Sequence, residues 1–263
     1  MGFKVDAYSD MGTRKNVNQD ALLIKQAKAA GYGNICLGVL CDGMGGLSCG
    51  EVASSAFVNR MDTWFKTELP QILLDKNITE PLDKSVDVSS AGQLLSRVEG
   101  QWKRVVTEMN DKLKAYGNNN GIRLGTTVVA IIIVGDEYMT MNVGDSRAYR
   151  FNKKQLAQVS HDHSYVQQQI ELGRMTEEEA QHSDKKSMLL QCIGASESVS
   201  PDFFTGKIER NMNFLLCSDG LWRKLEDKEI MGIAPQRNGI KKLAEMVMNR
   251  GESDNVSGLI ISI

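Results

Sequence analysis

Short apolar runs recur along most of the chain, and several of them are rich in β-branched residues and bounded by Gly, Asn or Asp. This pattern is typical of β-strands. Many of the runs are separated by only a few residues, which favours antiparallel hairpins over helical crossovers. The predicted strands cover residues 4–9, 21–25, 35–41, 126–134, 138–143, 147–151, 155–160, 203–209, 213–218 and 256–263.

Helical spacing of apolar residues is concentrated in two parts of the chain, at 49–69 together with 90–116, and at 226–250. In the segment 90–116 the apolar positions recur at steps of three and four residues, namely Leu95, Val98, Trp102, Val105 and Met109. The tetrapeptide NNNG at 118–121 predicts the end of this helix. Residues 163–183 are typical of two short helices joined by Gly173, and residues 70–93 are interpreted as a polar loop.

Closely spaced strands, two long helices after the third strand and further helices late in the chain predict an α+β fold. We expect an antiparallel β-sandwich flanked by helices on both faces. A chain of 263 residues is within range for one domain, so a single domain over 1–263 is predicted. Apolar residues make up 41% of the sequence, enough for a sizeable core.

The charge balance argues against several classes of partner. Lys and Arg number 31 against 33 Asp and Glu, which gives a net charge of −2. Since there is no basic stripe, we expect neither nucleic acid nor a membrane surface as partner. The five cysteines form no C-x-x-C pair, which favours reduced thiols in the cytoplasm. The N-terminus has no apolar signal core, and the longest apolar run, 128–134, is too short to cross a bilayer.

Five aspartates stand at the ends of predicted strands, and several of them adjoin glycine: Asp20, Asp42, Asp145, Asp219 and Asp254. Each one alone is typical of a turn residue. However, Asp42 and Asp219 directly follow apolar strands, so their carboxylates should emerge from the core. A charge in that position is costly unless it is paired or bound to a cation. All-oxygen ligation favours a hard ion such as Mg²⁺ or Mn²⁺.

Seven short blocks follow one another in order: RKNVNQD, CDGMGG, GTT, NVGDSRAYR, HDHS, CSDG and SDNVS. Together they resemble the type 2C, metal-dependent Ser/Thr protein phosphatases, and they span nearly the whole chain. The similarity is greatest to the compact bacterial members with one domain. It implies a monomeric cytoplasmic enzyme that hydrolyses phosphoserine and phosphothreonine in proteins, including the substrates of a bacterial Ser/Thr kinase.

The resemblance also implies a centre of two Mn²⁺ or Mg²⁺ ions. Asp42 would bridge both ions, and the carbonyl of Gly43 would bind one of them. Asp219 and Asp254 would complete the shell of the other ion, and Asp20 would contribute through bound water. Such a centre lowers the pKa of a water molecule and supplies hydroxide for in-line attack on phosphorus.

Two further roles follow from the resemblance. Asp145 matches the family position that holds a third, weaker ion together with the position of Asp219. Arg14 resembles the arginine that binds the substrate phosphate, which makes it a catalytic candidate with Asp42 and Asp219. The family usually places that arginine three residues before the asparagine, whereas Asn18 stands three residues after Lys15. Either the loop carries one extra residue or Lys15 takes the role, without the bidentate fork of an arginine.

Other positions also depart from the family pattern. Gln19 replaces a common glutamate, and Met44 stands where many eukaryotic members carry a histidine proposed as general acid. Because methionine donates no proton, substrates with good leaving groups should be favoured. Residues 165–193 correspond to the family's variable flap beside the active site, and a structural role is predicted for His163.

Two rival functions are considered. The segment from Cys217 to Arg223 fits the C-x5-R pattern of tyrosine phosphatases, in which a thiolate attacks phosphorus. Asp219 would place a carboxylate inside that anion site, and Leu216 stands where those enzymes carry histidine, so we interpret the match as accidental. The second rival is a catalytically weak regulatory or pseudophosphatase module on the same scaffold. Such a module should have lost metal carboxylates, whereas all five aspartates are present.

Overall fold

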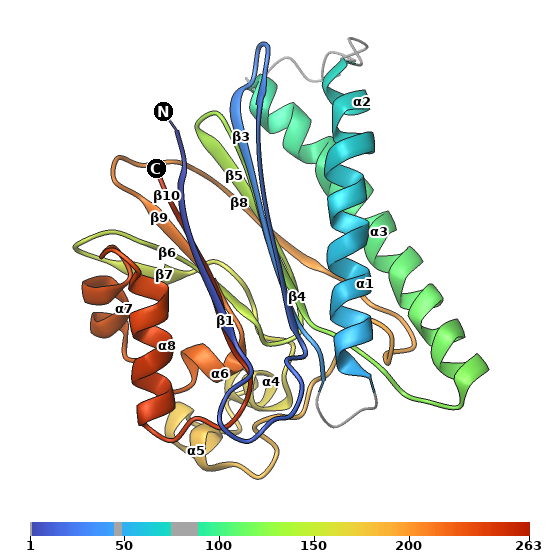
Figure 1. Cartoon of the computed structure of the whole chain (residues 1–263), viewed down its shortest axis with the longest axis vertical. Coiled ribbons are helices and arrows are strands. Elements are labelled where there is room, and N and C mark those ends of the chain that lie inside the picture. The colour runs from blue at the N-terminus through green and yellow to red at the C-terminus, as the bar shows by residue number, and fades with distance from the viewer. Residues whose placement is uncertain (1, 45–48, 75–88) are drawn as a thin grey trace.

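Two five-stranded antiparallel sheets lie face to face in the computed structural model, which describes residues 2–44, 49–74 and 89–263 (Figure 1). The first sheet has the order β1-β10-β9-β6-β7, with strands Lys4–Asp10, Val256–Ser262, Asn213–Cys217, Arg147–Phe151 and Leu156–Gln158. The second has the order β2-β3-β4-β5-β8, with strands Asp20–Ala29, Gly33–Asp42, Val128–Val134, Glu137–Val143 and Asp202–Lys207.

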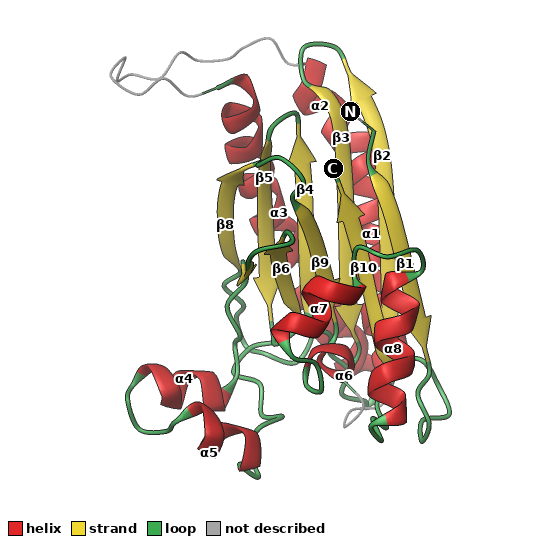
Figure 2. Cartoon of the chain, turned by 90° about the vertical axis from the view of Figure 1, so that its left-hand side faces the viewer, coloured by secondary structure: helices red, strands yellow, loops and turns green. Residues whose placement is uncertain are grey.

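Helices cover the outer face of each sheet. On the second sheet lie α1 (Gly50–Thr63), a π-helical turn (Trp64–Glu68), α2 (Leu69–Leu74) and the long α3 (Ser90–Asn120). On the first sheet lie α6 (Asp219–Trp222), α7 (Asp227–Ile233) and α8 (Gly239–Asn249). Two short helices, α4 (Tyr165–Glu171) and α5 (Glu177–His182), project from one end of the sandwich (Figure 2).

The burial of β3 explains why its sequence is a continuous apolar run. Alternate residues point to opposite faces of a strand. Leu37 and Val39 therefore pack in the cluster between the sheet and α1 and α3. Cys36 and Leu40 pack in the cluster between the two sheets, together with residues such as Phe214 of the other sheet. Because both faces of β3 are buried, it lacks the polar alternation of a strand with one face in water.

The predicted fold class and all ten predicted strands are confirmed, with boundaries that shift by a few residues. The predicted helix at 90–116 is also confirmed and ends at Asn120, just before Gly121. The helical region 226–250 consists of two helices, α7 and α8. The predicted loop at 70–93 is wrong at both of its ends, since residues 70–74 and 90–93 are helical. Its central part, 75–88, lies outside the described residues.

Pro70 does not end the helix in which it stands. It is the second residue of α2, and Leu69 separates it from the π-helical turn. The widened turn ahead of Pro70 leaves room for the proline ring that a regular α-helix lacks. Among the described segments, no helix combines the length and apolar character that a membrane crossing requires.

Candidate metal site

The hairpin of β2 and β3 brings two of the candidate carboxylates together. Asp20 and Asp42 are directly opposite each other in the antiparallel register. Residues paired in this way project to the same face of a sheet, and like charges in such a pair are destabilising. The hairpin end is therefore a place where a cation would relieve repulsion.

The first sheet brings Asp219 and Asp254 to the same end of the sandwich. Asp219 begins α6 directly after β9, and Asp254 lies just before β10, which pairs with β9. Gly220 makes the close approach possible, since a Cβ there would lie 2.2 Å from the carbonyl oxygen of Asn255. Only glycine fits where α6 contacts the chain entering β10, and this contact sets Asp219 beside Asp254.

Asn255 ties the N-terminal loop to this end of the sheet. Its side-chain Oδ1 accepts a hydrogen bond from the backbone N–H of Gln19 at 2.9 Å. Its Nδ2 donates to the carbonyl oxygens of Met11 at 2.8 Å and Val17 at 3.2 Å. A single buried amide thus holds the loop that carries the candidate phosphate-binding residues next to the carboxylates.

The electrostatics of the cluster indicate a site for cations. Burial raises the pKa of Asp42, and the nearby carboxylates of Asp20, Asp219, Asp145 and Asp254 raise it further. Burial raises the pKa of Asp20 to about 7, and the charges of Asp219 and Asp254 add to this rise against the lowering effect of side-chain hydrogen bonds with Ser257 and Ser218. Both carboxylate oxygens of Asp20 are buried. Carboxylates buried this close together are costly, and hard divalent cations would offset their charge.

Gly43 is confined on all sides, which explains why a glycine follows Asp42. Its N–H donates to the carbonyl oxygen of Gln19 at 3.0 Å. A Cβ at this position would lie 2.4 Å from the carbonyl oxygen of Gly50 and 2.6 Å from that of Gln19. No side chain fits there, so only backbone atoms of residue 43 are available beside the carboxylates.

Lys15, and not Arg14, contacts the carboxylate cluster. The Nζ of Lys15 lies 2.8 Å from Oδ1 of Asp254, whereas the Arg14 residue is exposed. Burial lowers the pKa of Lys15, but the hydrogen bond and charge of Asp254, with Asp42 and Asp219 behind it, raise the pKa overall. Of the two candidates for phosphate binding, Lys15 is therefore the one that contacts a carboxylate of the cluster.

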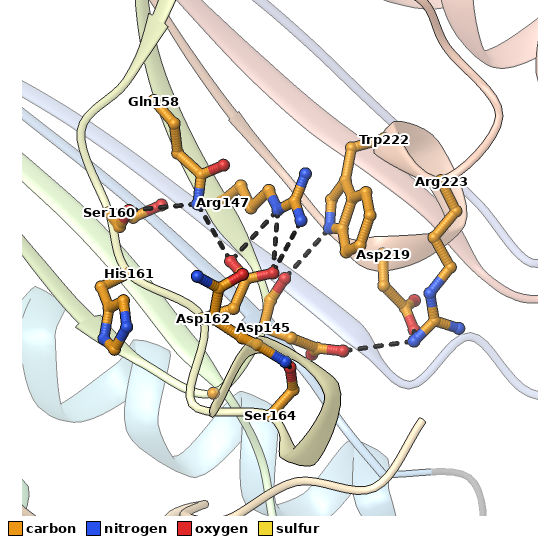
Figure 3. A network of polar contacts seen from close by, with 12 residues as sticks. Asp145, Arg147, Gln158, Ser160, His161, Asp162, Ser164, Asp219, Trp222 and Arg223 are labelled. Carbon is orange, nitrogen blue, oxygen red and sulfur yellow. Dashed lines mark hydrogen bonds and ion pairs between the residues drawn. The ribbon is translucent and has the colours of Figure 1, made fainter. Parts of the chain in front are cut away.

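Asp145 lies at the end of β5, where 5% of the residue is exposed. It contacts a second cation that sequence reasoning missed. The Nη2 of Arg223 lies 3.2 Å from Oδ2 of Asp145 and 2.8 Å from Oδ2 of Asp219 (Figure 3). The spacing of four residues between Asp219 and Arg223 was the available signal, because residues four apart are neighbours on a helix.

Comparison with known proteins agrees with this geometry. The family model described as Protein phosphatase 2C matches residues 12–257, which is most of the chain. The chain belongs to the protein phosphatase 2C family. This assignment confirms the predicted enzyme, a metal-dependent protein phosphatase of the serine/threonine class. The pseudophosphatase alternative gains no support, since all five aspartates are present and the electrostatic contacts link them in one cluster.

Several relatives of this phosphatase are bacterial proteins. The serine/threonine phosphatase stp of Listeria monocytogenes is 27% identical over 232 residues, which are 85% of this chain and 82% of that protein. The crystal structure of Stp1 from Staphylococcus aureus is 27% identical with a TM-score of 0.81, and the match covers 100% of this chain and 96% of that one. The PstP catalytic domain in complex with 2 manganese ions shares the fold at 23% identity and a TM-score of 0.72, over 99% of this chain and 97% of that one.

The cysteine mechanism is wrong for this phosphatase. The thiol of Cys217 is fully buried, and burial raises its pKa above the ordinary value of a cysteine. A nucleophilic cysteine requires the opposite shift. In addition, the guanidinium of Arg223 is bound by two carboxylates and does not line an anion site.

Two histidines meet at the base of the α4–α5 segment. The N–H of Gly144 donates to Nδ1 of His163 at 3.3 Å, so the proton of the neutral ring is on Nε2, 3.1 Å from Oδ2 of Asp202. His161 contacts the same carboxylate at 3.1 Å and Oε1 of Glu171 at 2.6 Å. With Nδ1 facing a donor, His163 cannot offer Nε2 as a lone pair to a metal ion. These contacts are those of a structural histidine.

We expect the contribution of His161 to stability to decrease as the pH rises. Burial lowers its pKa, but the contacts with Glu171 and Asp202 outweigh this and raise it overall. A raised pKa stabilises the fold fully below the unfolded value of about 6.5, and the effect is lost as the pH rises through the folded value. The side chain is 38% exposed, so solvent screening keeps the effect below about 1 kcal/mol.

This expectation is tested by the melting temperatures of the wild type and of His161→Gln in EDTA. The difference between them should be largest near pH 5.5 and shrink toward about pH 8.5. A difference that stays constant over this range would show that the charge of His161 does not stabilise the fold.

Proposed function

We propose that this phosphatase acts through a two-ion centre held by Asp42, Asp219 and Asp254, with the Gly43 carbonyl and Asp20 in support. The observation that carries the proposal is the convergence of strand-end carboxylates from both sheets, with Asp20 and Asp42 buried opposite each other. Divalent ions held by these residues would lower the pKa of a water molecule and so supply a nucleophile for phosphorus near neutral pH. Mn²⁺ and Mg²⁺ both suit an all-oxygen site.

In the proposed mechanism Lys15 binds the phosphate of the substrate. Its ammonium group is already beside Asp254, and the residue is half-buried. A lysine neutralises phosphate as a point charge, whereas an arginine would add a bidentate fork. Ions bound at Asp254 would repel the ammonium group from that carboxylate and leave it free for the phosphate. Arg14, the other candidate, is exposed on the same loop.

Comparing Lys15→Ala with Arg14→Ala tests this assignment. Loss of a hydrogen bond to a charged group costs about 1.5–3 kcal/mol, so we expect Lys15→Ala to raise KM about tenfold or more, with a smaller change in kcat. Arg14→Ala should change KM less than about twofold. The measurement is steady-state hydrolysis of p-nitrophenyl phosphate with Mn²⁺. The reverse order of effects would assign phosphate binding to Arg14.

We further propose that the substrates are phosphorylated proteins, among them targets of a bacterial Ser/Thr kinase. The relatives named serine/threonine phosphatase in Listeria and Staphylococcus support this class. A monomer in the cytoplasm is the proposed working state. Because Met44 offers no proton, the leaving alkoxide would be protonated by water, which favours good leaving groups.

Residues 165–193 are proposed to act as a flap beside the active site. A cavity of about 490 Å³ supports this role, since its lining joins Met44 to the C-terminal part of the flap at Leu190 and Cys192. Arg123 and Glu197 also line it and offer charges of both signs. The cavity adjoins the residue after Gly43, so it could hold the peptide on either side of the phosphorylated residue.

The function is tested with phosphopeptides. Phosphate release from phosphoserine and phosphothreonine peptides should require Mn²⁺ or Mg²⁺ and stop in EDTA. A phosphotyrosine peptide of the same sequence is the control, and its turnover should be much slower. Turnover that persists after complete removal of divalent ions would exclude the two-ion mechanism.

A further inference from the structure

Arg223 occupies the space between two buried carboxylates at the end of the sandwich. Its Nη2 lies 3.2 Å from Oδ2 of Asp145 and 2.8 Å from Oδ2 of Asp219. The side chains of these aspartates are only 7% and 14% exposed, and that of Arg223 is 24% exposed. A single nitrogen of the guanidinium thus joins the carboxylate that follows β9 to the one in the loop between β5 and β6.

The surroundings of Arg223 keep this cation in place. The neighbouring Trp222 donates from Nε1 to the carbonyl oxygen of Asp145 at 3.0 Å (Figure 3). The guanidinium of Arg147 stacks on the Trp222 ring, 3.4 Å from its centroid. Arg147 is itself held by Asp162, with Nε to Oδ1 at 3.1 Å and Nη2 to Oδ2 at 2.8 Å. The helical turn that carries Arg223 is therefore fixed to the backbone of the residue that Arg223 contacts.

This arrangement conflicts with a third divalent ion at Asp145. Such an ion would have to share the carboxylates of Asp145 and Asp219 with Arg223, which contacts Oδ2 of each. It would also lie within a few ångströms of a permanently charged guanidinium, and an arginine does not lose its proton in proteins. The residues present around Asp145 thus do not fit a third ion, while the other oxygen of Asp219 remains available to the two-ion centre.

We propose that the guanidinium of Arg223 takes the place of a third divalent ion, so that this phosphatase binds two ions and carries the third cation in its own chain. The inference rests on the two-ion centre proposed above. Arg223 is a positioning residue here: it neutralises Asp145, orients Asp219 and touches neither the substrate nor the reacting atoms. Its role is visible in the number of ions bound and not only in the rate.

The number of bound ions is the test. Equilibrium dialysis against Mn²⁺ up to millimolar concentration, followed by metal analysis of the full chain, should give two ions for the wild type. Arg223→Ala should bind one additional, weaker ion, because it frees both carboxylates. Arg223→Lys keeps a cation in place and should bind two, as the wild type does. Circular dichroism and thermal melting establish that each variant is folded.

Asp145→Asn gives an independent measurement that does not depend on the folding of Arg223 variants. If Arg223 replaces the ion, Asp145→Asn still binds two Mn²⁺ ions. A wild type with three ions that falls to two in Asp145→Asn would overturn the inference, and so would an Arg223→Ala variant that is folded and binds only two. A folded wild type that binds none would instead contradict the two-ion centre itself, so the two failures are distinguishable.

Discussion

Asp42→Asn is expected to abolish Mn²⁺-dependent hydrolysis of p-nitrophenyl phosphate. The carboxylate of Asp42 lies among four others, and we propose that it bridges both ions. Removing its charge takes away a ligand that no neighbour can replace, so kcat/KM should fall on the order of 10³-fold. Steady-state kinetics at saturating Mn²⁺ measure this effect.

The same substitution, which should abolish activity, should stabilise the metal-free protein. Burial and neighbouring carboxylates raise the pKa of Asp42, which shows that its ionised form is disfavoured in the metal-free fold. An amide carries no charge, so Asp42→Asn should raise the melting temperature in EDTA while it abolishes activity. Gain of stability with loss of catalysis distinguishes a metal ligand from a residue that only supports the fold.

Asp136→Asn is the matched control for the same chemical change. Asp136 is exposed in the turn between β4 and β5, at the other end of β5 from Asp145. Both its activity and its melting temperature should stay close to the wild type. If Asp42→Asn keeps more than about a tenth of the wild-type kcat/KM, Asp42 does not bridge the catalytic ions.

Gly220→Ala is expected to cost both stability and activity. The added Cβ would lie 2.2 Å from the backbone oxygen of Asn255, which cannot rotate away as a side chain could. Overpacking of this kind costs about 3 kcal/mol. Relief of the clash must move α6 away from the chain before β10, and that movement separates Asp219 from Asp254. We expect kcat to fall at least about tenfold, because a displacement near 1 Å at a catalytic site has large effects on rate.

Gly232→Ala provides the control for the glycine substitution. Gly232 is in α7, and a Cβ at that position would meet no atom within 4 Å. Alanine is favoured over glycine by about 0.5–1 kcal/mol in a helix interior and by less near a helix end, where Gly232 lies, so this variant should be at least as stable as the wild type and fully active. The measurements are urea unfolding and steady-state rates. A Gly220→Ala variant as stable and active as Gly232→Ala would show that the contact with Asn255 does not position Asp219.

The sequence by itself determined the elements and the class of chemistry. Strands appear as β-branched runs, and the 90–116 helix appears through its apolar spacing, because both patterns are local. The identities of the five aspartates also follow from local context, since a carboxylate after an apolar run is conspicuous wherever the rest of the chain lies. The sequence of β3 also indicates its environment: it lacks alternating polar residues because both faces of the strand are buried.

Only the tertiary structure decided how these elements meet. The pairing of β1 with β10 joins the two ends of the chain, and it sets the N-terminal loop beside Asp254. For that reason the choice between Arg14 and Lys15 could not be made from spacing, whereas one contact of 2.8 Å favours Lys15. The link from Arg223 to Asp145 joins residues that are 78 positions apart in the chain. Local sequence patterns do not predict such contacts, because the contacts depend on sheet pairing and on packing between residues far apart in the chain.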